Sequence, residues 1–140
     1  MEIGNIKFKA KRLDNGEWVK GDLVHSTSYV GISYPSDEFS DVPIVHRVDP
    51  STVCQFTGLK DCEGKEIWEG DILEHTQSHA RFTVMFDRGA FFIRKNGTEN
   101  TDLYLFELSE KDSCLQLFEV VGNKFDTGNS LESIYKSKKQ

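Results

Sequence analysis

Short runs of alternating apolar and polar residues fill the first half of the chain. Residues 6–12 read IKFKAKR, so apolar side chains alternate with basic ones, which is the period of a half-buried strand. Asp14, Asn15 and Gly16 predict a hairpin turn, after which residues 17–24 return as a second strand. Weaker strand patterns follow at residues 28–34, 42–48 and 52–56.

The second half of the chain shows the same alternation with clearer turns. Residues 80–86 alternate, and a turn at residues 87–89 leads back through a strand at residues 90–94. Residues 103–108 and 115–121 are nearly continuous apolar runs. A short apolar run bounded by turn residues is typical of a buried strand, so we expect both runs in the core.

The many short strands and frequent turns favour a mainly β protein. We expect the strands to coil into a small barrel or sheet, with the first hairpin packed on it as an annex. Residues 130–138 alone predict a helix, a short one near the C-terminus with Ser130 as its N-cap. The expected organisation is a single domain at residues 1–140, with a hairpin-rich part at 1–50, a barrel part at 51–126 and a short helix or tail at 127–140.

The stretch at residues 53–73, VCQFTGLKDCEGKEIWEGDIL, carries the most specific pattern and is called the signature stretch here. Asp61 and Gly64 form a D-x-x-G turn, because Asp bonds its own backbone and Gly tolerates positive φ. Gly70 is expected to let the chain bend. We predict that Ile67 and Trp68 place at least one large side chain in the core.

The signature stretch, together with residues 6–21 and 119–123, resembles the YopX-like proteins of phages and prophages. The resemblance covers most of the chain. The sequence departs from the family pattern at Cys54 and Cys62, where small or polar residues are usual, and at Trp68, where Tyr is common. The resemblance implies a phage or prophage protein of the bacterial cytoplasm and implies no particular reaction or ligand.

Charge and cysteine usage narrow the class of protein. The formal net charge is −6, so the chain lacks the broad positive field that supplies non-specific affinity for nucleic acid. The three cysteines, Cys54, Cys62 and Cys114, form no CxxC pair, which suits a reducing cytosol and leaves their roles open.

No apolar run reaches the roughly 20 residues of a membrane span. We expect no metal, cofactor, signal peptide or membrane contact.

The signature stretch is dense in carboxylates, which suggests a possible site. Asp61, Lys65, Glu66, Trp68 and Asp71 are the candidate binding residues of a small-ligand protein or an enzyme, because such groups act as acids, bases or cation ligands. The alternative is a charged hairpin surface with a few buried carboxylates that accept backbone N–H bonds. No catalytic residue is identified, and the missing motifs favour a non-enzymatic protein.

A second candidate surface is the basic stripe, defined as Lys7, Lys9, Lys11 and Arg12. Lysines on an exposed strand block edge-to-edge aggregation, which is one interpretation of the stripe. The other is contact with a phosphate backbone, which would make the protein a nucleic-acid-binding barrel. Few of the basic residues have aromatic neighbours on the same strand face for base stacking, and we expect no appreciable binding at physiological salt.

His75 and His79 are spaced like the ligands of a helical metal site, but Thr76 stands where the general-base Glu of an HExxH motif would be. The segment also falls between two predicted strands. We therefore expect a solvated hairpin loop there.

The leading hypothesis is a non-enzymatic accessory protein that binds a host or phage protein in the bacterial cytoplasm, with a homo-oligomer left open. Three observations distinguish it from the alternatives. Asp61, Glu66 and Asp71 gathered in one pocket would favour an enzyme, a continuous basic strip would favour nucleic acid, and an exposed aromatic patch would favour protein association.

Overall fold

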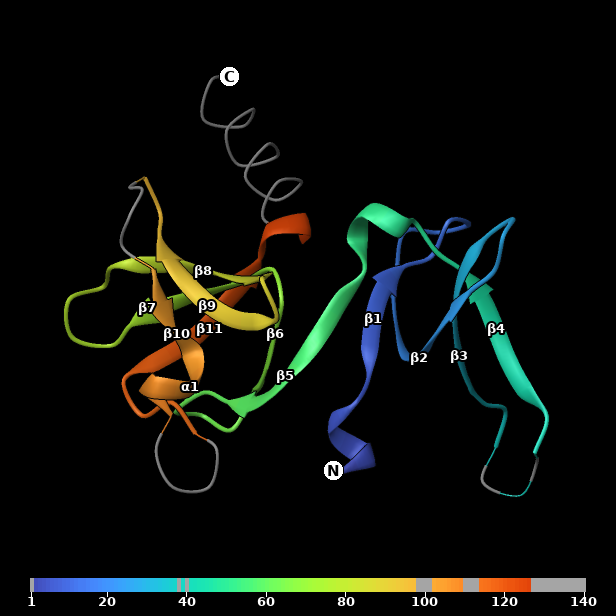
Figure 1. Ribbon diagram of the computed structural model, residues 1–140, viewed down its shortest axis with the longest axis horizontal. Coiled ribbons are helices and arrows are strands. Elements are labelled where there is room, and N and C mark those ends of the chain that lie inside the picture. The colour runs from blue at the N-terminus through green and yellow to red at the C-terminus, as the bar shows by residue number, and fades with distance from the viewer. Residues whose placement is uncertain (1, 38, 40, 98–101, 110–113, 127–140) are drawn as a thin grey trace. The chain divides into compact units, whose positions relative to one another are not determined.

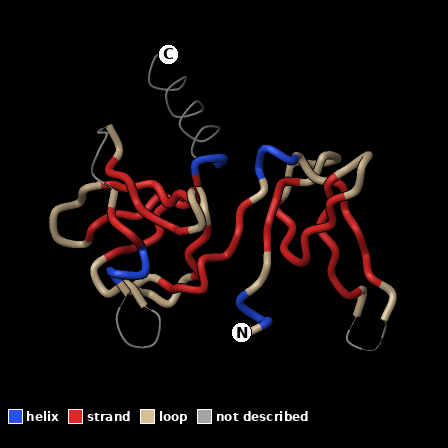
Figure 2. The backbone as a smooth tube through the Cα atoms, in the orientation of Figure 1, coloured by secondary structure: helices blue, strands red, loops and turns tan. Residues whose placement is uncertain are grey.

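The computed structural model describes residues 2–37, 39, 41–97, 102–109 and 114–126. Most of these residues lie in antiparallel strands (Figures 1 and 2), which confirms the prediction of a mainly β protein. The chain divides into two compact units, Met1–Phe56 and Thr57–Gln140, called the first and second unit here. A single domain over residues 1–140 stays a prediction.

The first unit is built from consecutive hairpins. The predicted hairpin at residues 6–24 is confirmed, and Phe8 pairs with Gly21 across it. Phe8 and Ala10 face the core of this unit, which is centred on Ala10, Ile32 and Val48. The elements are η1 (Ile3–Asn5), β1 (Phe8–Lys11), β2 (Trp18–His25), β3 (Val30–Pro35), β4 (Pro43–Arg47), η2 (Pro50–Thr52) and the first residues of β5 (Cys54–Lys60).

The second unit continues along β5 and contains the larger of the two cores. Its buried cluster combines residues from neighbouring strands with Leu105 and Leu115 from the connections. The elements are β6 (Glu66–Trp68), β7 (Asp71–His75), β8 (Arg81–Asp87), β9 (Ala90–Lys95), β10 (Leu103–Tyr104), α1 (Leu105–Leu108) and β11 (Phe118–Asn123). The fully or almost fully buried members of the cluster are Ile67, Leu73, Val84, Ile93, Leu105, Leu115 and Phe118.

The strands form two antiparallel sheets that do not close into a barrel within the described residues. The strand orders are β4-β3-β2-β1-β5-β6 and β10-β9-β8-β7-β11. In the first unit an isolated antiparallel β-bridge joins Arg12 to Val48, just beyond the ends of β1 and β4. This contact is one residue pair and not a continuous ladder between those two strands. The prediction allowed a barrel or a coiled sheet, and the structure has the sheets.

The apolar run at residues 103–108 differs from its prediction as a buried strand. It forms the two residues of β10 and then turns into α1. Leu105 is fully buried, whereas Phe106 is 81% exposed, because one turn of helix points successive side chains in different directions. The helix predicted at residues 130–138 lies outside the described residues. No helix in the described ranges has the length and apolar character of a membrane span.

Candidate functional site

The carboxylate of Asp61 organises the turn that follows β5. Asp61 is fully buried. Its Oδ1 accepts hydrogen bonds from the backbone N–H of Glu63 (2.9 Å) and of Lys65 (2.8 Å), and its Oδ2 accepts one from the N–H of Val120 (2.8 Å). Charge-assisted bonds of this kind satisfy a buried carboxylate. Asp61 therefore fixes the turn and joins it to β11.

Asp71 plays a similar part at the other end of the signature stretch. Its Oδ2 accepts the backbone N–H of Trp68 (2.8 Å), and its Oδ1 accepts the side-chain amide of Asn123 (3.0 Å). Gly70, which lies between Trp68 and Asp71 in the sequence, adopts φ +86°. Its backbone N–H donates to the carbonyl oxygen of Val84 (2.8 Å). A positive φ favours glycine, so the predicted bend at Gly70 is confirmed.

The five candidate residues of the signature stretch have different environments. Asp61, Trp68 and Asp71 are buried, Glu66 is half-buried and Lys65 is exposed. The burial of Trp68 confirms the expected core contribution of this corner. A binding role for the five residues stays a prediction, and none of them lines either of the two hollows described below.

The lysines of the basic stripe lie against aromatic rings of neighbouring strands. The Lys7 Nζ is 4.7 Å from the centre of the Phe56 ring, and the Nζ atoms of Lys9 and Lys11 are 4.6 and 5.4 Å from the Trp18 ring. These are cation–π distances. The rings come from neighbouring strands, which a strand-by-strand interpretation of the sequence does not reveal: Trp18 is the cross-strand partner of Lys11.

Arg12, the last residue of the basic stripe, forms an ion pair with Asp14 in the adjoining turn. The Arg12 Nε and Nη2 donate to the two carboxylate oxygens of Asp14 at 2.9 and 2.6 Å. This hydrogen-bonded pairing lowers the pKa of Asp14 and raises that of Arg12. Contact between the basic stripe and nucleic acid stays a prediction.

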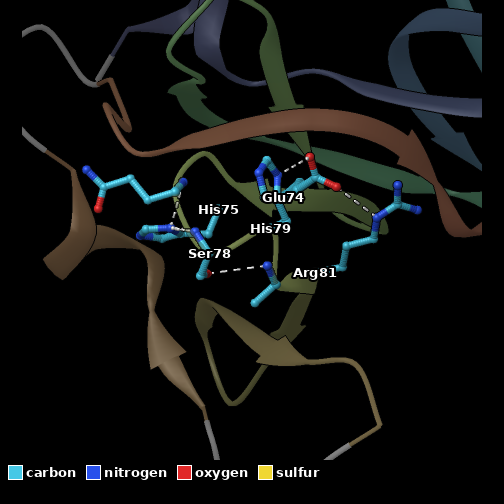
Figure 3. Close-up of polar contacts among 7 residues, drawn as sticks. Glu74, His75, Ser78, His79 and Arg81 are labelled. Carbon is cyan, nitrogen blue, oxygen red and sulfur yellow. Dashed lines mark hydrogen bonds and ion pairs between the residues drawn. The ribbon is translucent and has the colours of Figure 1, made fainter.

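The segment with His75 and His79 is the hairpin loop between β7 and β8, as predicted (Figure 3). The Nδ1 of His75 accepts hydrogen bonds from the N–H groups of Gln77 and Ser78, both at 3.2 Å. His79 adopts φ +61°. Among the described residues no three His, Cys, Asp or Glu side chains are grouped to hold a metal ion.

Beside this loop, Glu74 is paired with two basic side chains (Figure 3). One carboxylate oxygen is 3.1 Å from Nε of Arg81, and the other is 3.5 Å from Nδ1 of His79. The hydrogen bond from Arg81, followed by that from His79, lowers the pKa of Glu74. Both bonds favour the ionised carboxylate.

We expect Glu74→Gln to change how stability depends on pH. The folded pKa of Glu74 is lower than its unfolded value of about 4.3. The stabilisation is therefore fully present above that value and is lost as the pH falls through the folded pKa. The melting temperatures of wild type and Glu74→Gln should differ at pH 6 and converge toward pH 3. A difference that stays constant over this range, or an equal effect in the exposed-turn control Glu63→Gln, would contradict the assignment.

The three cysteines are free thiols. Cys54 is buried, and Cys62 and Cys114 are half-buried. The Sγ of Cys114 donates to the carbonyl oxygen of Asp61 at 3.1 Å. Burial raises the pKa of the Cys62 thiol, and the negative charge of Asp61 adds to the effect. A raised pKa reduces the thiolate fraction and with it the reactivity of the thiol.

The second unit contains an apolar hollow with a volume of about 490 Å³. It is lined by Thr57 and Leu59 of β5, by residues 89–91 in the β8–β9 turn and the start of β9, and by residues 104–107. Leu105 forms a fully buried part of the lining. The hollow is called the apolar hollow below.

Exposed apolar side chains lie at the rim of the apolar hollow and beside it. Phe106 and Tyr104, which line it, are 81% and 56% exposed. Phe86 in β8 is 43% exposed, and its ring lies 4.8 Å from that of Phe91, which also lines the hollow. Exposed apolar groups gathered in this way mark surfaces that bind other molecules.

A second hollow, of about 330 Å³, lies on the charged side of β9 and β10. The Arg94 guanidinium donates to both oxygens of Asp102 at 2.7 and 3.0 Å, which lowers the pKa of Asp102. Arg88 and Asp87 also line this hollow, so two arginines face two carboxylates. The balanced charge gives it no preference for a cation or an anion.

The rim residues Tyr104 and Phe106 were absent from the predicted site. The run LYLFEL at residues 103–108 was assigned to the core because it is almost entirely apolar. Glu107, the one charged residue of the run, was the signal that the segment reaches the surface.

The fold is that of a mainly β protein with two units, a signature stretch fixed by buried carboxylates, and an apolar hollow in the second unit. Residues 7–132 match the family model described as YopX protein. The match spans most of the chain, so the chain belongs to the YopX family. The resemblance found in the signature stretch is thereby confirmed.

One solved structure has a similar fold over nearly the whole chain. It is the crystal structure of protein EF1440 from Enterococcus faecalis, with a TM-score of 0.53 and 19% sequence identity. The alignment covers 90% of the present chain and 97% of that chain. Identity this low supports a shared fold. The comparison with curated proteins gave no match.

Proposed function

We propose that this YopX-family chain is a non-enzymatic accessory protein of a phage or prophage. It acts in the cytoplasm of the bacterial host by docking a host or phage protein at the apolar hollow. The observation that carries the proposal is the apolar hollow itself, with exposed Phe106 and Tyr104 at its rim.

The energetics of protein association favour such a rim. Phe106 is exposed at 81%, and covering a phenyl ring of this kind removes a large apolar area from water. Aromatic anchors that fill a pocket dominate the binding energy of many interfaces. The hollow of about 490 Å³ is large enough to receive apolar side chains of a partner.

The environment of the signature carboxylates supports a non-enzymatic protein. Asp61 and Asp71 each use both carboxylate oxygens to hold backbone or amide N–H groups. A carboxylate that acts as a base or nucleophile must reach its substrate. These two are buried, and their oxygens are engaged in the hydrogen-bond network of the signature stretch.

The test compares two exposed phenylalanines. Phe106→Ala removes the aromatic ring at the rim. The control, Phe39→Ala, removes the same kind of ring from the first unit, where Phe39 is 90% exposed. Tagged wild type and both variants are used to capture partners from phage-carrying host cells, and the captured protein is then purified and titrated against each. We expect Phe106→Ala to weaken binding at least tenfold, or roughly 1.4 kcal/mol, with unchanged melting temperature.

Two results would overturn the proposal. One is a purified partner that binds wild type and Phe106→Ala with equal affinity. The other is a partner that is lost after Phe39→Ala and retained after Phe106→Ala, which would move the docking surface to the first unit.

A further inference from the structure

We infer that the partner segment docked at the apolar hollow combines an apolar side chain with an adjacent arginine. The apolar side chain enters the hollow, and the arginine is held at the rim by the carboxylate of Glu107 and the rings of Tyr104 and Phe106, which all line the hollow. This inference rests on the proposed function and specifies the chemistry of the partner at the same site.

The single turn of α1 holds the rim groups in place. Leu105, its first residue, is fully buried and belongs to the core cluster of the second unit, so the turn is anchored from inside. Close to its other end, the backbone N–H and the hydroxyl of Ser109 both donate to the carbonyl oxygen of Phe106, at 3.3 and 2.8 Å. On the other side, β10 pairs Tyr104 with Phe92 of β9. A rim that is fixed before binding loses little conformational entropy when a partner covers it.

The carboxylate of Glu107 is not engaged within the protein. Among the described residues, the Glu107 side chain forms no hydrogen bond or ion pair, whereas Glu74 and Asp102 are each paired with an arginine. Of the described residues that line the apolar hollow, Glu107 alone is charged. Its carboxylate can therefore accept hydrogen bonds from a basic group of a docked molecule.

The two exposed rings of the rim favour arginine over lysine as that basic group. Tyr104 and Phe106 line the same hollow as Glu107, and in the described part of the chain no basic side chain lies over either ring. A planar guanidinium stacks on an aromatic face and donates paired hydrogen bonds to a carboxylate, whereas the ammonium of lysine is a compact point charge. A rim with both kinds of group therefore suits arginine.

The charge of the chain favours the same partner. Residues 107–112 read ELSEKD, with three carboxylates and one lysine, and the whole chain carries a formal charge of −6. This charge attracts a basic segment and repels an acidic one. A second copy of the chain fits the hollow less well for the same reason, because two copies that met at this face would bring like charges together.

The apolar side chain and the arginine have different parts in binding. The hollow has a volume of about 490 Å³ and is lined by Leu59, Phe91 and Leu105 among others, so a side chain that enters it is largely removed from water. An ion pair at an exposed rim contributes little by itself. The apolar anchor therefore supplies most of the affinity, and the arginine selects among segments that carry such an anchor.

The experiment uses the full chain and a random library of nine-residue peptides. The library is selected for binding, and the enriched peptides are titrated by fluorescence anisotropy. We expect them to carry an apolar residue with an arginine near it. Phe106→Ala should weaken their binding at least tenfold, and the control Phe39→Ala should leave it within about twofold. Enriched peptides that are acidic, or that lack a basic residue, would overturn the inference.

A double-mutant cycle tests the pairing of Glu107 with the arginine. The best peptide is compared with a copy in which citrulline replaces arginine, because citrulline keeps the shape of the side chain and loses its charge. Citrulline and Glu107→Gln should each weaken binding at least fivefold. Both changes together should add less than about twofold to either alone, since both remove the same interaction. The matched control Glu63→Gln, in an exposed turn of the same unit, should leave binding within about twofold. Equal binding of the two peptides, or fully additive losses, would contradict the pairing and overturn the inference.

The outcomes separate this inference from the proposed function. Binding that depends on Phe106 and is unaffected by Glu107→Gln overturns the inference and leaves the proposed function standing. Peptide binding that is unaffected by Phe106→Ala overturns both. If no peptide is enriched, the inference fails, and the capture experiment still tests the proposed function. Wild type that sediments as a dimer, and that Phe106→Ala dissociates, would identify a second copy as the occupant and also overturn the inference.

Discussion

Asp61→Ala should lower the free energy of unfolding by about 4 kcal/mol. The carboxylate is fully buried and accepts three backbone N–H groups, those of Glu63, Lys65 and Val120. Removing it leaves these donors without their partner, and each buried donor left unsatisfied costs about 1–3 kcal/mol. Water that enters the space left by the side chain would offset a fraction of this cost.

Urea unfolding of wild type and Asp61→Ala measures this change. The matched control is Asp87→Ala in the β8–β9 turn, where the side chain is 70% exposed and its ion pair to Arg88 is long, at 3.9 Å. The control should change stability by less than about 0.5 kcal/mol. A loss below about 1 kcal/mol for Asp61→Ala would mean that the turn and β11 hold together without the carboxylate.

Trp68→Ala should cost about 3 kcal/mol. The indole is 2% exposed, and replacing a buried aromatic side chain loses its transfer free energy and leaves a cavity. The backbone N–H of Trp68 also donates to Asp71, so a backbone shift that filled the cavity would strain this bond. The measurement is again urea unfolding.

Phe106→Ala serves as the control for Trp68→Ala, since it removes an aromatic side chain that is 81% exposed in the same unit. It should change stability by less than about 0.5 kcal/mol. Similar losses for the two variants would show that the Trp68 ring contributes no more to the core than an exposed ring does.

The hairpins could be predicted from the sequence because their pattern is local. Residues 6–12 alternate strictly, and the turn at Asp14, Asn15 and Gly16 has the residues that a hairpin needs. The signature bend was predictable for the same reason, since Gly70 lies between the apolar pairs at residues 67–68 and 72–73. The structure confirms both.

Features that depend on pairing between distant segments could not be predicted. Trp18 lies under Lys9 and Lys11 because β1 and β2 pair in one particular register. Whether the strands close into a barrel is likewise a property of the whole sheet. The exposure of Phe106 depends on where β10 ends, and composition alone assigns an apolar run to the core.

The sequence suggested two uses for the carboxylates of the signature stretch and could not decide between them. An Asp in a D-x-x-G turn has the same local pattern whether it faces water or a buried backbone. The N–H of Val120 that bonds Asp61 lies 59 residues further along the chain, and no local pattern indicates that partner.

The bond between Asp61 and Val120 has a consequence for the order of events during synthesis. A ribosome completes the signature stretch well before it adds β11, so the Asp61 carboxylate must stay hydrated until Val120 leaves the exit tunnel. Closing a loop of 59 residues is slow compared with forming a hairpin. The second unit therefore completes its fold only after β11 has been synthesised, and a chain truncated before β11 would lack the Val120 N–H that bonds Asp61.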